Sequence, residues 1–368
     1  MIKGKHVLLY DYLFSKGGAE KLSLTLVEGI ESCDLIVGLK DNQLFPKKRL
    51  DNNGGEIKVL TGYSDKKGWK TLKVMLAYIL NAPKLAEYDC AVYSGEYAPM
   101  AILRSKARAR RNILYCHTIP RAPYDLYQFK LERFKGINRI LFKIFAYFIK
   151  SLYEPSINSM DLVVANSQNV QKRIKTNLGI DSIIVHPPID TERFEWISQG
   201  DYYLSTARLE PAKRVGLIIE AFKLMPQKKL IIASGGSEYE DLKLQAKGFD
   251  NITLTNWNSD EALHELVGNC IATIYIPVDE DFGMSPLESM AAGKPCIGVA
   301  EGGLLETIIP GKNGWFIKHP DKFSIKAVVM DASPKQALEM RLDCQNQAHK
   351  FSSEIFLEKM ATCMNGIP

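Results

Sequence analysis

Short runs of β-branched and apolar residues alternate with amphipathic stretches along both halves of this 368-residue chain, and this alternation restricts the fold more than any other feature. The runs lie at 7–10, 35–38, 57–60, 90–93, 113–116 and 162–165, and then at 202–207, 229–234, 251–254, 270–277 and 295–299. Strands separated by helices form parallel sheets that are covered on both faces. The pattern therefore predicts an α/β protein with two Rossmann-like, doubly wound domains that face a central cleft.

The two halves of the chain differ in charge. Residues 1–190 contain 29 Lys and Arg against 18 Asp and Glu, whereas residues 191–368 contain 18 against 24. Pro187 and Pro188 stand where the charge changes, and such a segment is typical of a domain boundary. The sequence thus predicts domains over 1–190 and 191–350. The basic half suits an anionic lipid surface, nucleic acid or an acidic substrate.

Composition narrows the class of protein. No apolar run reaches the 18 residues of a membrane span, and the chain enters a strand almost at once, which predicts no signal peptide. Seven cysteines without a CxxC pair indicate buried thiols in a reducing, cytoplasmic setting. The six histidines lack the spacing of a zinc site, and no P-loop or GxSxG motif occurs. We therefore expect no metal.

Two carboxylates, Glu280 and Glu288, are eight positions apart in the stretch 280–288. A strand of predicted span 270–277 precedes them, and a helix is expected to begin at Pro286. Ligands of open α/β sheets bind outside the carboxyl ends of strands, and helix N-termini favour anions. The stretch suits a sugar diphosphate site, and it equally suits an acidic loop before an ordinary amphipathic helix.

Two cations, Arg208 and Lys213, follow the predicted strand 202–207. An Arg and a Lys at one strand end can both reach a single diphosphate. Read alone, such a pair is more often two solvated surface cations than a ligand site. Since this loop and the Glu280 loop both follow strands of one predicted parallel sheet, we expect both to open at the same edge.

Further candidates lie in the first half. Gly17 and Gly18 precede a helix predicted through about Ile30, where glycine permits positive φ and close approach to a ligand, although most such pairs are simple turns. His117 ends the strand 113–116 and can bond a sugar hydroxyl or move a proton, or it can be bonded within its own loop. A basic, aromatic-rich helix predicted over 127–153 suits either a membrane interface or a buried core position.

These residues together resemble a retaining glycosyltransferase of family 4 with the GT-B fold, a group 1, mannosyltransferase-like type. The resemblance rests on Arg208 and Lys213, on Gly235 with Gly236, and on the E-x7-E element Glu280 to Glu288, in the order of that family. In the first half, residues 17–20 and 115–117 match its Gly-rich loop and its His-ended strand. Asp281 departs from the family, where glycine is usual.

The resemblance implies a role for each matching residue. His117 and Glu280 would contact the donor sugar as the catalytic pair, Arg208 and Lys213 would hold the donor diphosphate, and Glu288 would bind the ribose. The remaining expected donor contacts are Gly17, Gly18, Gly235, Trp257 near the base, Phe282, Gly283, Met284 and Ser285. The final helix, within about 350–368, would pack back on the first domain.

The resemblance thus implies an enzyme that transfers a hexose from a nucleoside-diphosphate sugar, with GDP-mannose expected first and a UDP-sugar second. The acceptor is expected to be a glycan or a lipid-linked glycan, without nucleic acid, on or near the cytoplasmic face of a membrane. Two rival interpretations are a GT-B sugar-nucleotide epimerase or phosphorylase, and a non-catalytic module with a basic binding surface.

Overall fold

The chain divides into two compact units in the computed structural model, which describes residues 4–14, 17–46, 55–62 and 69–366. Unit 1 comprises residues 1–187 and 354–368, and unit 2 comprises residues 188–353. The expected entry into a strand at the very start of the chain involves residues 1–3, which lie outside the described residues. The first strand begins at His6.

Unit 1 is a parallel sheet with the strand order β3-β2-β1-β4-β5-β6-β7. Its strands are β1 (His6–Leu13), β2 (Cys33–Lys40), β3 (Ile57–Val59), β4 (Cys90–Ser94), β5 (Arg111–Cys116), β6 (Leu162–Ala165) and β7 (Ile183–Ile184). Its helices are α1 (Gly18–Gly29), α2 (Trp69–Leu80), η1 (Ala98–Leu103), η2 (Ser105–Ala107), α3 (Tyr127–Arg133), α4 (Gly136–Asn158), α5 (Gln168–Leu178) and α14 (Ser353–Asn365). The order matches the Rossmann arrangement.

Alternate residues of the central strands of unit 1 enter different cores. In β1, Val7 and Leu9 join the cluster on one face of the sheet, and Leu8 joins the cluster on the other face. Successive side chains of a strand point to opposite faces, so a strand covered on both faces is apolar throughout. α14 covers the same face as α1: Phe356 packs on Tyr115 of β5 with their ring centroids 6.0 Å apart.

Unit 2 repeats this topology with the strand order β10-β9-β8-β11-β12-β13. Its strands are β8 (Tyr202–Ser205), β9 (Lys229–Ile232), β10 (Ile252–Leu254), β11 (Thr273–Tyr275), β12 (Cys296–Val299) and β13 (Gly314–Ile317). Its helices are η3 (Pro211–Lys213), α6 (Val215–Lys223), α7 (Tyr239–Ala246), α8 (Asp260–Asn269), α9 (Met284–Ala291), α10 (Leu304–Thr307), α11 (Lys322–Asp331), α12 (Pro334–Glu339) and α13 (Arg341–His349). All its strand pairs are parallel.

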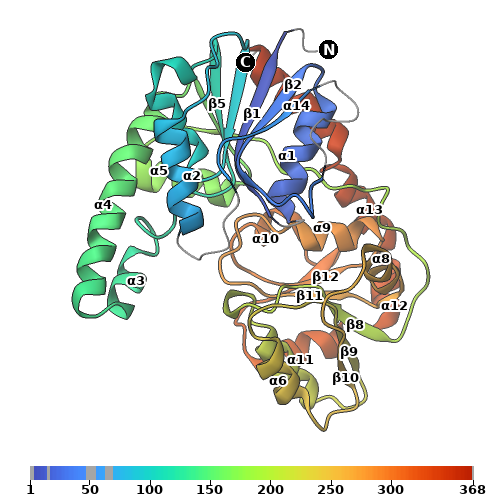
Figure 1. Ribbon diagram of the computed structural model, residues 1–368. Helices are drawn as coiled ribbons and strands as arrows, with labels where there is room; N and C mark the ends of the chain where they lie inside the picture. The colour runs from blue at the N-terminus through green and yellow to red at the C-terminus, as the bar shows by residue number, and fades with distance from the viewer. Residues whose placement is uncertain (1–3, 15–16, 47–54, 63–68, 367–368) are drawn as a thin grey trace. The chain divides into compact units, whose positions relative to one another are not determined.

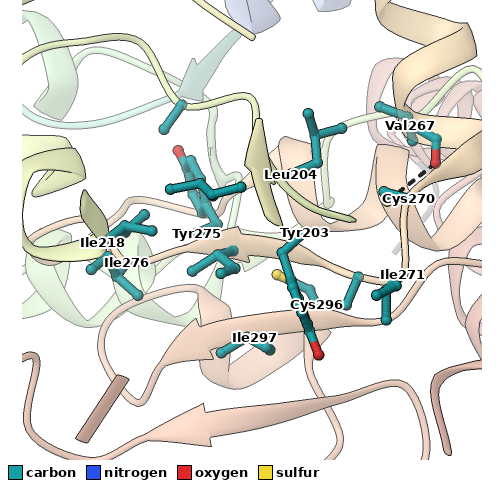
Figure 2. Packing of buried hydrophobic residues seen from close by; sticks show 14 of the residues in the cluster. Tyr203, Leu204, Ile218, Val267, Cys270, Ile271, Tyr275, Ile276, Cys296 and Ile297 are labelled. Carbon is teal, nitrogen blue, oxygen red and sulfur yellow. Dashed lines mark hydrogen bonds between the residues drawn. The ribbon is translucent and has the colours of Figure 1, made fainter. Parts of the chain in front are cut away.

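The core of unit 2 orients two tyrosines, Tyr203 and Tyr275, which have different roles. The rings of Tyr203 and Tyr275 point to opposite sides of the cluster (Figure 2). Tyr203 is fully buried, and its hydroxyl donates to the backbone carbonyls of Val329 and Ala332. Tyr275 ends β11, and its hydroxyl lies beside a lysine after β8. One ring therefore anchors a helix, whereas the other reaches the carboxyl edge of the sheet.

The structure corrects several predicted elements. The single helix predicted over 127–153 is two helices, α3 and α4, interrupted at Phe134 and Lys135. The helix expected from Pro286 begins at Met284, and the strand 270–277 is shorter, Thr273–Tyr275. The predicted α/β class with two parallel Rossmann-like sheets is confirmed, and all seven cysteines are buried with free thiols, as expected.

Candidate functional site

Each unit has one point at which the strand order reverses, between β1 and β4 in unit 1 and between β8 and β11 in unit 2. The loops that leave two neighbouring strands at such a point run in opposite directions and leave a crevice for a ligand. In unit 2 the residues after β8 include Arg208 and Lys213, and those after β11 include Glu280. The sequence prediction that both loops open at one edge is confirmed.

Lys213 and Glu280 form the central contact of this edge in unit 2. The Lys213 ammonium lies 2.5 Å from a Glu280 carboxylate oxygen and 3.0 Å from the Tyr275 hydroxyl oxygen. Burial, followed by the Glu280 charge, raises the pKa of Tyr275, so the hydroxyl stays protonated. The Glu280 carboxylate therefore balances the charge of Lys213, and the lysine side chain remains partly accessible to solvent.

Backbone contacts hold the two loops together. The amide of Val278 donates to the carbonyl of Ala212 at 2.8 Å, which joins the segment after β11 to the segment after β8. Beyond them, the Arg214 guanidinium donates to the Glu301 carboxylate at 3.1 Å. Because these loops are fixed by hydrogen bonds, the position of Lys213 relative to Glu280 is determined before any ligand binds.

Gly302 and Gly303 support the Glu280 loop from behind. The amide of Gly303 donates to the Glu280 carbonyl at 2.8 Å, and a Cβ on Gly302 would lie 2.4 Å from that carbonyl oxygen. Gly302 also has φ +57°, in the left-handed region that favours glycine. The loop between β12 and α10 therefore needs glycine at this position for Glu280 to keep its place.

Helix α9 adds backbone donors next to the carboxylate. Gly283, with φ +88°, precedes the helix, and Met284 and Ser285 form its first turn. The first amides of a helix have no partner within the helix and favour a negative charge. Phe282 is buried against Phe351 with ring centroids 5.5 Å apart, which anchors the loop. Glu288 lies one turn beyond Ser285 and is half-buried.

Two further predicted residues, Gly235 and Trp257, lie together. A Cβ on Gly235 would come within 2.4 Å of the Trp257 indole nitrogen, so only glycine lets the indole lie this close. Gly235 follows β9 and Trp257 follows β10, and Trp257 is 66% exposed. Arg208 is exposed on the neighbouring loop, and within the described part of the chain its guanidinium has no hydrogen-bond partner. A flat ring and a free cation therefore face solvent at this edge.

In unit 1, the reversal point brings His117 to a serine and two tyrosines. Ser94 Oγ lies 2.8 Å from His117 Nε2, and the sheet register pairs Ser94 with Tyr10 on one side and with Tyr115 on the other. The His117 ring makes edge contacts with both tyrosines, at 6.3 Å and 5.2 Å between centroids. Burial lowers the pKa of His117 to about 4, so the imidazole is neutral near pH 7.

Asp11, one residue after Tyr10, is fully enclosed at the same end of β1. Its carboxylate accepts from the backbone amides of Glu96, Tyr97 and Ala98 at 2.6 to 3.1 Å and so holds the start of η1. Burial raises the pKa of Asp11 to about 7, against the lowering effect of these amides.

Gly17 and Gly18 begin α1, as predicted. Gly17 precedes the helix with φ −78°, so the positive φ that would demand glycine is not used there. Close approach to a ligand is one reason for glycine at this position, and the preference for glycine over alanine at a helix N-cap is another. Gly17 and Gly18 belong to unit 1 with His117, whereas Arg208, Lys213 and the residues 280–288 belong to unit 2. That these two sets meet in one cleft stays a prediction.

Sequence analysis missed several residues that build this edge, namely Ser94, Tyr275, Arg214, Glu301, Gly302 and Gly303. The pair Gly302 and Gly303 after a predicted strand was a usable signal, whereas the pairing of Ser94 with His117 depends on sheet register. Among the described residues, no group of three or more His, Cys, Asp or Glu side chains is placed to hold a metal ion.

Known proteins resemble the chain over nearly its whole length. Residues 17–193 match the model of Glycosyltransferase Family 4, and residues 188–351 match that of Glycosyl transferases group 1. An Alpha-1,3/1,6-mannosyltransferase ALG2 from Dictyostelium discoideum is 26% identical over 361 residues, 81% of this chain and 83% of its own. The ALG2 of Homo sapiens is also 26% identical, over 74% and 72% of the two chains.

Solved structures share the fold at low sequence identity. The structure of Anabaena HepE in complex with UDP-glucose superimposes with a TM-score of 0.74 at 16% identity, covering 98% of this chain and 99% of that one. At this identity the likeness concerns the fold alone, and it agrees with the two parallel sheets described above. The chain therefore belongs to the glycosyltransferases of the GT-B fold, and it carries a family 4 domain followed by a group 1 domain.

Proposed function

We propose that this glycosyltransferase moves mannose from GDP-mannose to a hydroxyl of a glycan or a lipid-linked glycan, with retention at the anomeric carbon. The mannosyltransferase names of the relatives, which align with most of this chain, support mannose as the transferred sugar. A UDP-hexose is the second candidate donor. The site of action proposed is the cytoplasmic face of a membrane, in line with the basic first half of the chain.

The observation that carries the proposal is the edge of unit 2 at which Lys213 meets Glu280 beside Arg208, an exposed cation without a hydrogen-bond partner among the described residues. A diphosphate needs two or more donors of positive charge, and an Arg fork with a Lys point charge supplies them. The first amides of α9 add donors at Met284 and Ser285. Glu280, held by Lys213 without a ligand, then becomes free to accept from sugar hydroxyls when phosphate takes the lysine.

The other candidate residues bind the remaining parts of the donor, namely the ribose, the base and the sugar. Glu288, one turn into α9, accepts from the ribose hydroxyls, and Trp257 offers its exposed face to the base. In unit 1, Gly17 and Gly18 leave room for a phosphate at the start of α1, and His117 contacts the sugar as a neutral hydrogen-bond partner. Ser94 fixes the orientation of that imidazole through its hydroxyl.

The reaction breaks the bond between the anomeric carbon and the diphosphate oxygen and forms one between that carbon and the acceptor oxygen. The acceptor proton passes to the departing phosphate oxygen on the same face of the sugar, so configuration is retained and GDP leaves. Arg208, Lys213 and the α9 amides stabilise the negative charge that develops on the diphosphate. Because these cations supply that stabilisation, we propose that the reaction is independent of a metal ion.

Thermal unfolding with GDP-mannose, UDP-glucose and a dTDP-sugar tests the donor, since a ligand that binds only the folded state raises the unfolding midpoint. We expect the largest rise with GDP-mannose, its loss in Arg208→Ala, and mannose transfer to a lipid-linked glycan that persists in EDTA. A larger rise of the unfolding midpoint with UDP-glucose would indicate a UDP-sugar as the donor in place of GDP-mannose. Activity abolished by EDTA and restored by Mg²⁺ would contradict metal independence.

Product analysis separates the rival enzymes. Conversion of the nucleotide sugar to its epimer without acceptor would indicate an epimerase, and turnover that requires inorganic phosphate would indicate a phosphorylase. Salt-sensitive binding of nucleic acid without any response to nucleotide sugars would indicate a non-catalytic basic module. The configuration of the transferred mannose, measured by NMR of the product, tests retention directly.

A further inference from the structure

Helices α3 and α4 form a hairpin on unit 1 that uses only one side of α4 for packing (Figure 1, green). The side chains on that side recur at intervals of three or four residues and are buried; they are Phe142, Ala146, Ile149 and Tyr153. α3 closes on the same helix, with Tyr127 stacked on Phe142 at 5.6 Å between centroids. The hairpin is therefore anchored through a narrow stripe.

The opposite side of α4 is apolar and exposed. We call this the outer face of α4, and it comprises Ile137, Ile140, Leu141, Ile144, Tyr147 and Phe148, each between 41% and 77% exposed. These residues lie within three turns of one helix, whereas single exposed apolar residues on a protein surface are normally scattered. Of the two positions predicted for the segment 127–153, a membrane interface or a buried core, the buried core therefore does not describe this side of α4.

Cations flank the outer face. Arg139, Lys143 and Lys150 are spaced by four and seven residues, so they line one side of α4 between its packed stripe and its outer face. Residues 127–153 contain six Lys and Arg and one acidic residue, Glu132. Lys143 and Lys150 also line a shallow groove of about 190 Å³ with Tyr127 and Tyr147. Apolar exposure and positive charge thus coincide on one hairpin.

We propose that the outer face of α4 docks on the surface of an anionic lipid bilayer, with its apolar side chains between the acyl chains and its cations among the headgroup phosphates. A helix with an apolar face and a basic flank lies in the plane of a membrane interface. Tyrosine, present at 147, is favoured at the depth of the headgroups. A bilayer satisfies both the apolar and the charged part of this surface at once.

Charge complementarity selects the bilayer over a second copy of this chain. Two copies that met antiparallel through their outer faces would bring two rows of cations together, and in a parallel pair neither row would meet a carboxylate of the other copy's outer face, so charge does not favour either pair. An anionic lipid surface instead attracts each of Arg139, Lys143 and Lys150. The proposal does not depend on the sugar donor or the acceptor, because it concerns a surface of unit 1 that contains none of the candidate donor residues.

Flotation of the full chain with vesicles tests the proposal. We expect binding to vesicles of equal parts phosphatidylcholine and phosphatidylglycerol and much weaker binding to phosphatidylcholine alone. The double variant Arg139→Ser with Lys143→Ser is expected to reduce affinity for the anionic vesicles by roughly tenfold or more, with the remaining binding less sensitive to salt. Equal binding of this variant and the unchanged chain would overturn the role of charge.

The apolar part is tested with Ile140→Glu combined with Ile144→Glu, which we expect to abolish vesicle binding. The matched control is Leu244→Glu combined with Leu342→Glu, which changes two leucines of unit 2 that are each 70% exposed. The control should bind vesicles normally, and both variants should keep the thermal unfolding midpoint and its rise with a nucleotide sugar. If the control variant loses vesicle binding as fully as the Ile variant, the docking surface is not the outer face of α4. The proposal is also wrong if the unchanged chain binds no vesicles and instead forms a dimer that the Ile variant disrupts.

Discussion

The two units share one strand order and place opposite chemistry at the point where that order reverses. In unit 2 this point holds a charged pair, Lys213 with Glu280, and an exposed Arg208. In unit 1 it holds a neutral His117 bonded to Ser94 among tyrosines, with Asp11 enclosed nearby. The strand order determines which edge of the sheet a ligand can reach. The few residues that follow each strand determine whether the site at that edge is charged and exposed or neutral and buried.

The largest expected effect is on donor affinity, and it compares two cations of unit 2: Lys213, which is paired with Glu280, and Arg208, which has no hydrogen-bond partner among the described residues. Arg208→Ala and Lys213→Ala are each expected to lower donor affinity by about 10- to 100-fold, since a hydrogen bond to a charged group contributes roughly 1.5–3 kcal/mol. Only Lys213→Ala should also lower the free energy of unfolding, by about 1 kcal/mol, because it leaves Glu280 without its 2.5 Å partner. Calorimetric titration with nucleotide sugar and chemical denaturation measure the two quantities.

Glu280→Gln is the control for that pair, because it removes the carboxylate charge and keeps an acceptor for Lys213. We expect its stability to lie between the unchanged chain and Lys213→Ala. If Arg208→Ala destabilised the fold as much as Lys213→Ala, the distinction between a paired and an unpaired cation would be wrong.

The next effect compares glycines of the two units. Gly302→Ala is expected to cost roughly 1–3 kcal/mol of stability, since residue 302 has a left-handed φ and its Cβ would meet the Glu280 carbonyl. Gly17→Ala should cost less, about 0.5–1 kcal/mol, because its φ of −78° suits any residue and only the N-cap preference for glycine over alanine is lost. Urea unfolding of both variants checks this, and a strongly destabilised Gly17→Ala would show that the glycine is structural.

A third effect concerns Trp257, whose exposed ring is expected to bind without supporting the fold. Trp257→Ala should lower donor affinity by about tenfold, the size of one stacking interaction with a base, and leave the unfolding midpoint unchanged. The same loss of affinity for GDP, UDP and their sugars is expected, because stacking does not read the base. Retained affinity in Trp257→Phe is the control, since the phenyl ring keeps a flat face.

The sequence predicted the architecture well because hydrophobic periodicity reports how a strand is covered. The predicted runs 35–38 and 90–93 contain no charged residue, and in the structure every residue of β2 and β4, which include them, is buried. It also predicted which loops meet, since parallel strands all end at one edge: Lys213 and Glu280, 67 positions apart, lie in contact. These inferences need only the strand positions.

What the sequence could not predict depends on contacts between distant segments. Ser94 meets His117 because β4 and β5 pair in one particular register, and a shift by one residue would turn the serine to the other face. The pattern 127–153 carries apolar residues on two opposite sides of the helix with cations between them, so it fits a buried and an exposed position equally well. The break at Phe134 and Lys135, which creates the hairpin of α3 and α4, has no proline to announce it.

The smallest expected effect is a pH dependence in which two groups of unit 1 oppose each other. The pKa of His117 falls from 6.5 to about 4 in the folded chain, so the unfolded chain takes up a proton first and stability decreases as the pH falls from 6.5 to 4. The pKa of Asp11 rises from 3.8 to about 7, so the folded chain keeps its proton longer and stability decreases as the pH rises from 3.8 to 7.

Because the two windows overlap, their contributions largely cancel, and removing one group should expose the other. For His117→Asn we expect the free energy of unfolding, relative to the unchanged chain, to decline by on the order of 1 kcal/mol between pH 4 and 6.5. For Asp11→Asn the same difference should rise over that range. Denaturation series at several pH values measure both slopes, with Arg208→Ala in unit 2 as a variant of unchanged slope. Slopes of the same sign in the two variants would mean that desolvation does not set the charge of this pair, and the contrast between a neutral unit 1 and a charged unit 2 would lose its basis.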